Sequence, residues 1–371
     1  MCNFFNYVNN LGQSVTGRTM DAMSTVGADH MSIRLTPKGI AKASNSDNPV
    51  TWTSKYNAVA MWSYNGLVFE AMNEKGFTAS GLYLVESNYG LLNGRKTLSV
   101  PSLCQFAVDS FATVEEVVNY FESEKDNICI VTSSSCVAPY LSNLPVSIHW
   151  AFTDAHGDGV AMEFLDGELN FFRFTGVSMA MTNDPNYNKQ LTVLEYLRKK
   201  SLPLCMPGTA MDADRFMRIS GWLEMAHNEP MPEAYCELPE QNATWQKRNF
   251  AKSLIHAMNT PHLMDFEEND NNSSTIWSVN CDQNNGWIYL EHLRSFSYIF
   301  LEFDKLDFEH GVQELPMYNG ITYLGDVSDK FVPVEGDLEF AYVDVNNMDW
   351  NNYDPAMKEE VLAARIAKVG F

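Results

Sequence analysis

The stretch Met1-Cys2-Asn3-Phe4-Phe5, taken together with Gly17-Arg18-Thr19-Met20-Asp21, decides how this chain is interpreted. If the initiator methionine is removed, Cys2 becomes the N-terminus and carries both a thiol and a free α-amine. A cysteine thiol has an ordinary pKa of about 8.5 and an α-amine one of about 7.7–8.0, so the amine is a usable base near neutral pH. One residue then holds a nucleophile and its proton acceptor. By itself, a cysteine after the start methionine is more often just a tolerated small residue.

Three further motifs follow these two along the chain. They are Met72-Asn73-Glu74-Lys75-Gly76, Met181-Thr182-Asn183-Asp184-Pro185 and Asp214-Arg215-Phe216-Met217-Arg218. The five motifs in this order resemble the choloylglycine hydrolase family of N-terminal-nucleophile hydrolases, which includes penicillin V acylases and conjugated bile salt hydrolases. The resemblance runs from Cys2 to about residue 310. It implies an α+β fold, a four-layered αββα sandwich of two antiparallel sheets, with Cys2 on a central strand.

The resemblance assigns roles to two charged residues near Cys2. The family arginine that matches Arg18 contacts the nucleophile, and the aspartate that matches Asp21 holds the α-amine. A cation beside a thiol favours the thiolate, which is the form that attacks. Without the resemblance, Arg18 and Asp21 would be interpreted as an ordinary surface pair at the end of a strand.

Two more catalytic residues are implied downstream. The resemblance makes the side-chain amide of Asn183 an oxyanion-hole donor, and removal of one such donor typically costs about 10²–10³ in rate. Turn chemistry alone would also explain an asparagine before Asp184-Pro185. Arg215 matches the second catalytic arginine of the family. Arg218, one turn later, is the alternative if the register of the match is wrong, and a solvated helix arginine is the plain interpretation of either.

Tyr83, in Gly81-Leu82-Tyr83-Leu84, matches the other oxyanion position, where its backbone N–H would be the donor. Bile salt hydrolases commonly carry asparagine there, and many penicillin V acylases carry tyrosine. The residue therefore favours a cysteine amidase that cleaves a small-molecule linear amide of the penicillin V type, or an N-acyl homoserine lactone. A conjugated bile salt hydrolase is the first alternative.

The composition of the chain argues against several classes of binding partner. The 25 basic and 47 acidic residues give a net charge of −22, which argues against nucleic acid and anionic membranes as partners. The seven cysteines and eight histidines show no CxxC, no HExxH and no Cys/His cluster, so we expect no metal and no cofactor. No apolar run is long enough for a transmembrane helix and no export signal is visible. We expect a cytoplasmic protein as written, or a periplasmic one if a native signal peptide was removed.

The hydrophobic periodicity predicts strands and helices in alternating groups. Thr113 and Glu116 form a capping box, and Asn65-Gly66 and Asp166-Gly167 are hairpin turns. Helices are predicted at Pro101–Ala112, Val114–Glu122, Tyr187–Lys200, Asp212–Asn228 and Trp245–Met258. Strands are predicted at Asn3–Val8, Ser14–Met20, Ala58–Tyr64, Leu67–Met72, Phe77–Leu84, Asn127–Thr132, Ser147–Asp154, Val160–Leu165, Glu168–Phe174, Thr275–Cys281, Gly286–His292 and Tyr298–Phe303. We expect one domain over 1–371, with 316–371 as an acidic C-terminal extension packed on it.

Two other hypotheses remain open at this point. One is an internal Cys–His enzyme that uses Cys104 or Cys281, and the other is an inactive binding protein that retains Met1. The assembly is open as well. The segment between Asn183 and Arg215 is shorter than in the Gram-positive relatives, where it forms an assembly loop, so we expect either a homotetramer or a homodimer.

Overall fold

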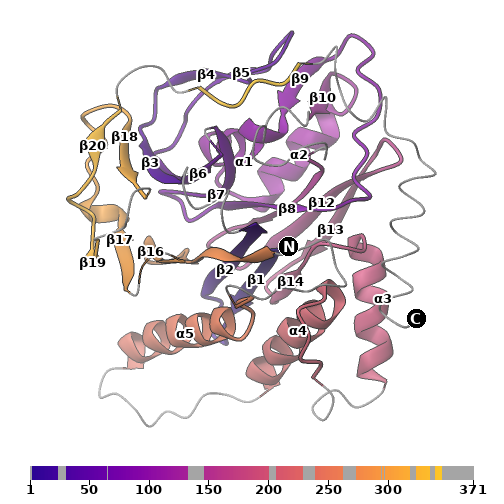
Figure 1. The fold of residues 1–371 in the computed structure, drawn as a ribbon, viewed down its shortest axis with the longest axis vertical. Coiled ribbons are helices and arrows are strands. Elements are labelled where there is room, and N and C mark those ends of the chain that lie inside the picture. Colours follow the sequence, from indigo (N-terminus) through magenta and orange to yellow (C-terminus); the bar gives the residue numbers. More distant parts are fainter. Residues whose placement is uncertain are drawn as a thin grey trace.

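Two large β-sheets lie face to face with helices on both outer surfaces (Figure 1). The computed structural model describes residues 2–23, 31–64, 66–132, 146–199, 206–228, 239–261, 273–293, 295, 297–317, 323–334 and 339–344. The predicted four-layered αββα sandwich is confirmed. In the described part of the chain, no helix has the length and apolar character needed to cross a bilayer.

The seven-stranded sheet carries the N-terminus. All neighbouring strands in it are antiparallel except the last pair, which is parallel. Its order is β14 (Met179–Met181), β1 (Cys2–Val8), β2 (Ser14–Met23), β15 (Ser273–Asp282), β16 (Trp287–His292), β17 (Tyr298–Glu302) and β19 (Gly325–Asp326). Cys2 therefore begins an inner strand, between β14 and β2 and second from the edge of this sheet.

The nine-stranded sheet is antiparallel throughout. Its order is β13 (Glu168–Phe174), β12 (Gly159–Leu165), β11 (Ile148–Thr153), β8 (Thr78–Tyr83), β7 (Leu67–Asn73), β6 (Ala58–Ser63), β3 (Ser32–Thr36), β18 (Gln313–Pro316) and β20 (Val332–Pro333). Two small sheets pair β4 (Ala41–Ala43) with β5 (Thr51–Thr53) and β9 (Lys96–Ser99) with β10 (Ile128–Val131).

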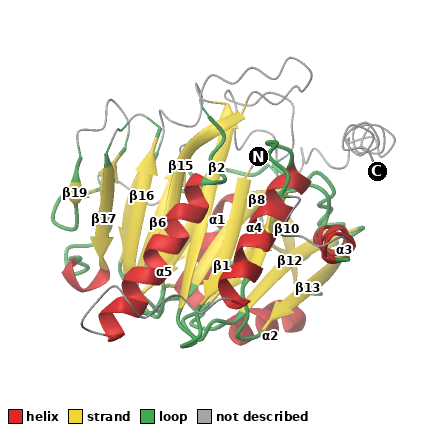
Figure 2. Ribbon diagram, turned by 90° about the horizontal axis from the view of Figure 1, so that it is seen from below, coloured by secondary structure: helices red, strands yellow, loops and turns green. Residues whose placement is uncertain are grey.

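The helices form the outer layers. In Figure 2, α4 (Asp212–Asn228) and α5 (Pro239–His256) lie across the seven-stranded sheet, and α3 (Tyr187–Arg198) lies beside α4. The opposite face of the molecule carries α1 (Val100–Ser110) and α2 (Val114–Glu124). All five predicted helices are present, and α5 begins earlier than predicted.

The predicted local signals are confirmed where the structure describes them. The Thr113 hydroxyl accepts the N–H of Glu116 at 3.2 Å, while the Glu116 carboxylate accepts the N–H of Ala112 rather than that of the cap residue itself. Asp166 and Gly167 have φ of 53° and 84°, as a tight hairpin turn requires. Asn65, in the other predicted turn, lies outside the described residues.

The strand β11 is buried on both of its faces. Ile148, Trp150 and Phe152 alternate with His149, Ala151 and Thr153 along this strand. All six residues of the strand are buried, including His149. The reason is that β11 is an inner strand, paired on both edges by β8 and β12 and covered on both faces.

Part of the predicted C-terminal extension completes the two sheets. β19 pairs with β17, and β20 pairs with β18. Phe340 is 3% exposed and stacks on Trp62 with ring centroids 5.1 Å apart. These described segments therefore bury side chains against the body of the protein. Residues 345–371 lie outside the described residues.

Candidate active site

The site straddles the two faces of the β1–β2 pair. Cys2 pairs with Met20, Asn3 with Thr19 and Phe4 with Arg18. Since paired residues share a face and successive residues alternate, Cys2, Met20 and Arg18 point to one side of the sheet. Asn3, Thr19 and Asp21 point to the other. Tyr7, on the same face as Asn3, packs on Phe250 of α5, which identifies this second face as the one toward the helices.

The Cys2 thiol lies beside the Arg18 guanidinium, as the resemblance implies. Arg18 Nη2 is 3.8 Å from Cys2 Sγ, and Met20 Sδ is 3.9 Å from the same sulfur. Arg18 extends from the seven-stranded sheet to the nine-stranded one, where Nη2 donates to the carbonyl of Gly81 at 2.8 Å. Its Cζ lies 4.6 Å from the centre of the Trp277 ring. The guanidinium is therefore buried, held by a carbonyl and an aromatic face, with one edge toward the sulfur.

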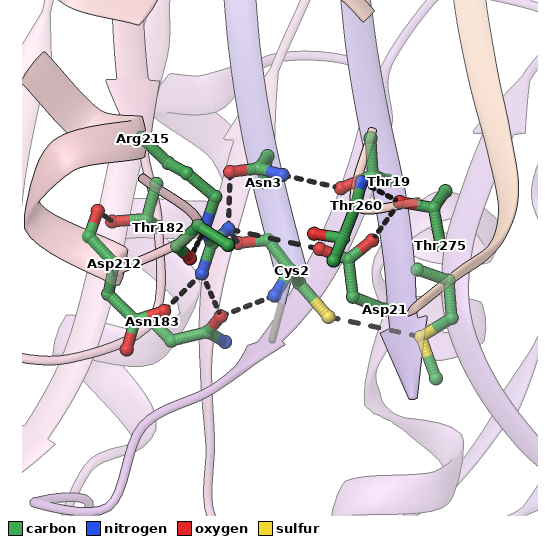
Figure 3. Close-up of polar contacts among 12 residues, drawn as sticks. Cys2, Asn3, Thr19, Asp21, Thr182, Asn183, Asp212, Arg215, Thr260 and Thr275 are labelled. Carbon is green, nitrogen blue, oxygen red and sulfur yellow. Dashed lines mark hydrogen bonds and ion pairs between the residues drawn. The ribbon is translucent and has the colours of Figure 1, made fainter. Parts of the chain in front are cut away.

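The backbone nitrogen of Cys2 donates to the side chain of Asn183 (Figure 3). Asn183 accepts with Oδ1, and its Nδ2 donates to the Tyr83 carbonyl at 2.7 Å. One amide side chain therefore connects the start of β1 to the end of β8, in the opposite sheet. The structure places Cys2, Asn183 and Tyr83 in one cluster although they lie far apart in the sequence.

Arg215, from α4, closes the site on the helix face. Its Nη1 donates to the Cys2 carbonyl at 2.7 Å and to Oδ1 of Asn3, and Nη2 pairs with Asp212. Asp21 Oδ2 lies 4.0 Å from Arg215 Nη1. Figure 3 shows the backbone of Cys2 between Arg215 and Asp21. Both atoms of the Cys2 main chain that can form hydrogen bonds are thus bound by side chains.

The Asp21 carboxyl is buried, and burial raises its pKa above the ordinary value, while the charge of Arg215 and hydrogen bonds from Thr275 and Thr19 lower it. Thr275 Oγ1 donates to Asp21 Oδ1 at 2.7 Å. A carboxylate held by a cation and two hydroxyls has a fixed orientation, which suits a group that binds an amine.

A β-bulge in β15 serves both faces of the site. Thr275 pairs with Asp21 and Trp277 pairs with Met20, so Ile276 between them has no partner on β2. In a regular strand, residues two apart face the same side. The extra residue places Thr275 on the helix face, against Asp21, and Trp277 on the opposite face, against Arg18.

A model of the choloylglycine hydrolase family of linear amide C–N hydrolases matches residues 2–311. The chain belongs to this family. Penicillin V acylase of Pectobacterium atrosepticum is 27% identical over 303 residues, which cover 78% of each chain. Penicillin V acylase from Agrobacterium tumefaciens has a similar structure, with a TM-score of 0.76 at 26% identity over 92% of this chain and all of that one.

A variant of the conjugated bile acid hydrolase from Clostridium perfringens also shares the fold, with a TM-score of 0.66 at 18% identity over 86% of this chain and 97% of that one. The family membership confirms the predicted class of enzyme, an amide hydrolase of the acylase kind with a cysteine at residue 2. The roles of the individual site residues remain predictions.

One side chain that positions the site of this choloylglycine hydrolase family member was not predicted, a glutamine on the first turn of α3. Gln190, in α3, donates to the carbonyls of Asn183 and Pro185 at 3.0 and 2.7 Å and accepts the N–H of Thr182 at 3.2 Å. It thereby fixes the segment that presents Asn183. A glutamine on the first turns of the helix after Asp184-Pro185 was the available signal, but glutamine is also an ordinary helix residue.

The alternatives for the arginine and the nucleophile find no support in the geometry. Arg218 Nε donates to the carbonyl of Ala257 at 3.2 Å and Nη1 to that of Pro207, so the Arg218 side chain binds backbone groups other than those of Cys2. Cys104 and Cys281 are fully buried, and burial raises the pKa of both thiols, which disfavours the thiolate. Within the described ranges, no group of three His, Cys, Asp or Glu side chains is arranged to hold a metal.

Proposed function

We propose that this protein is an N-terminal cysteine amidase of the penicillin V acylase type, with Cys2 as its nucleophile once Met1 is removed. The observation that carries the proposal is the pair of contacts at residue 2. The sulfur lies 3.8 Å from Arg18 Nη2, and the nitrogen donates to Asn183. A thiol beside a cation and a nitrogen held by an amide oxygen are the arrangement expected of a residue that is both nucleophile and base.

The reaction then follows in two halves. The Cys2 thiol gives its proton to the α-amine, and the thiolate attacks the amide carbonyl of the substrate. The negative charge on the carbonyl oxygen is stabilised by the Tyr83 backbone N–H and by the second N–H of Asn183 Nδ2. The α-ammonium protonates the leaving amine as the C–N bond breaks. A water molecule, deprotonated by the amine, attacks the thioester and releases the acid.

Arg18, Asp21 and Arg215 have supporting roles in this scheme. The Arg18 charge favours the thiolate, and the Asp21 carboxylate favours the ammonium that forms when the amine takes the proton. Arg215 binds the Cys2 carbonyl at 2.7 Å and keeps Asp21 and Asn183 in place. All six groups predicted from the sequence are used.

The proposed substrate is an amide with a flat phenoxyacetyl or straight acyl chain, such as penicillin V or an N-acyl homoserine lactone. Tyr83 ends β8, and its carbonyl accepts a hydrogen bond from Asn183, so we expect its ring to narrow the approach to Cys2. A rigid steroid would have to pass this ring to reach Cys2, whereas a flat or straight acyl chain fits beside it. We therefore expect a higher kcat/KM for penicillin V or an acyl homoserine lactone than for any conjugated bile salt.

The test compares three forms of the protein on a panel of penicillin V, penicillin G, glyco- and tauro-conjugated bile salts and N-acyl homoserine lactones. Protein whose mass shows loss of Met1 should hydrolyse at least one member. Cys2→Ala should be folded and inactive, and so should a form that retains Met1, because its Cys2 nitrogen is tied up in a peptide bond. The form that retains Met1 keeps the thiol, so it isolates the contribution of the free amine.

Each result that would contradict the proposal overturns a different part of it. Turnover by Cys2→Ala would remove the nucleophile assignment, and full turnover with Met1 retained would remove the amine from the mechanism. Glycocholate as the best substrate would place the enzyme with the bile salt hydrolases and overturn the argument from Tyr83.

A further inference from the structure

A buried carboxylate lies behind the arginine that contacts the nucleophile. Glu70, on β7, is 0% exposed, and its Oε2 is 3.8 Å from Arg18 Nε. Ser80 Oγ, on the adjacent strand β8, donates to the same carboxylate oxygen. The four groups Ser80, Glu70, Arg18 and Cys2 therefore form a continuous row of contacts that runs from the nine-stranded sheet to the start of β1. The mechanism proposed above makes no use of Glu70.

The backbone of β7 is shaped to bring Glu70 to this place. Glu70 pairs with Met61 and Val68 pairs with Trp62, so Phe69 is an extra residue in the strand. As in β15, the bulge changes the alternation, and both Phe69 and Glu70 approach Arg18, whose Cζ is 5.9 Å from the Phe69 ring. Bulges that re-aim side chains are common next to active sites.

The Arg18 guanidinium depends on few other contacts. Its Nη2 donates to the Gly81 carbonyl at 2.8 Å, but Nε and Nη1 are buried and have no hydrogen-bond partner among the described residues. The Glu70 carboxylate is the acidic group whose oxygen Oε2 lies 3.8 Å from Nε. Removing it would leave a buried cation whose remaining contacts are one carbonyl, the sulfur atoms of Cys2 and Met20, and aromatic faces, which is an unfavourable arrangement.

We propose that Glu70 is a positioning residue that holds the Arg18 guanidinium next to the Cys2 sulfur. This inference rests on the proposed function in giving Cys2 the role of nucleophile. It adds a residue from the other sheet that sets how readily the thiol reacts. In the absence of the Glu70 charge, the guanidinium moves away from the sulfur and the thiolate loses its neighbouring cation.

Glu70 changes its charge near neutral pH. Burial raises the pKa of Glu70 to about 7, against the lowering effects of the Arg18 charge and the Ser80 hydrogen bond. Cys104 on α1 and Cys281 on β15 also interact with Glu70, and burial raises the pKa of both thiols, so they stay neutral there. Glu70 is ionised above about pH 7 and neutral below it. Positioning of Arg18 should therefore be lost as the pH falls through 7.

The test measures alkylation of Cys2 by iodoacetamide between pH 5.5 and 9, followed by the mass of the Cys2 peptide in the folded full-length protein. In wild type, the rate should show an additional rise near pH 7, on top of the ordinary increase from thiol ionisation. Glu70→Gln should lack that rise and react about tenfold more slowly at pH 8. Glu70→Asp should keep the rise, because it keeps the carboxylate.

Two further variants separate positioning from general damage. Ser80→Ala removes a hydrogen bond that lowers the Glu70 pKa, so the additional rise should move to higher pH. Asp109, on α1, forms a different buried ion pair, with Lys42. Asp109→Asn breaks this pair and should leave the pH dependence of Cys2 alkylation as in wild type. If Glu70→Gln does not fold, Ser80→Ala still decides the matter.

The inference is overturned if Glu70→Gln follows the wild-type curve, or if it reacts faster because the Glu70 charge merely offset that of Arg18. An unmoved curve in Ser80→Ala would overturn it as well. Since no amide substrate is used, failure to find a hydrolysed substrate would not affect this test. Where a substrate is found, kcat should fall about tenfold in Glu70→Gln with KM nearly unchanged.

Discussion

At the scale of single residues, Arg215 and Arg218 offer a direct comparison, because they lie one turn apart on α4 and differ in what they bind. Arg215 donates to the Cys2 carbonyl and lies 4.0 Å from Asp21, whereas Arg218 donates to backbone carbonyls outside the site. A hydrogen bond to a charged group contributes about 1.5–3 kcal/mol. At about 1.4 kcal/mol per tenfold change in rate, Arg215→Gln should lower kcat/KM about 10- to 100-fold or more.

Arg218→Gln should stay within a few-fold of wild type in steady-state assays on the best member of the substrate panel. Both variants also need a melting curve, because Arg215 is buried and Asp21 and Asp212 lose their cation when it is removed. An equal loss of activity in the two variants would mean that the second arginine of the family motif has been assigned to the wrong residue.

At the scale of elements, the close pairing of β1 with β2 depends on Gly17. A Cβ built at this position would lie 2.2 Å from the ring of Phe5, its partner across the pair, and 2.8 Å from Asn280 Nδ2 on β15. Overpacking of this kind typically costs about 1–3 kcal/mol. We expect Gly17→Ala to lose that much stability in urea unfolding and to lower activity by shifting Cys2 relative to Arg18.

The matched control is Gly208→Ala, because a Cβ at Gly208 meets no atom within 4 Å. We expect it to change the free energy of unfolding by less than about 1 kcal/mol. A Gly17→Ala variant as stable and active as the control would show that the Phe5 ring moves aside freely and that the glycine of this motif is kept for another reason.

At the scale of the whole molecule, the segment 339–344 is expected to unfold together with the two sheets. Phe340 is 3% exposed and stacks on Trp62 of β6, whereas Tyr342, two residues later, is 49% exposed. Truncation of a buried phenylalanine costs about 3–5 kcal/mol. Phe340→Ala should therefore lower the midpoint of a single thermal transition, and Tyr342→Ala should leave it nearly unchanged. A separate early transition in wild type would instead mark the C-terminal part as an independent unit.

The sequence predicts those parts of the molecule whose determinants are local. The helix that carries Asp214-Arg215-Phe216-Met217-Arg218 follows from its periodicity, whereas Cys2, Arg18 and Asp21 are identified as site residues only through the resemblance of their motifs to the family. The placement of Thr275 and Glu70 was not predicted, because each depends on a one-residue change of register between strands from distant parts of the chain. Short strands such as β14 were missed for a related reason. Three residues carry too little periodicity to be recognised without their partner strand.

Because of the bulge at Ile276, β15 contains one residue more than its pairing with β2 requires. A strand has only even and odd positions, and one inserted residue exchanges the two for everything that follows it. Trp277, the first residue beyond Ile276, therefore faces Arg18, although Thr275, two residues earlier, faces the helices. Deletion of Ile276 would remove the bulge and leave Thr275 paired with Asp21 and Trp277 with Met20, so we expect both side chains to keep their faces, as they would on exchange of the Ile276 side chain.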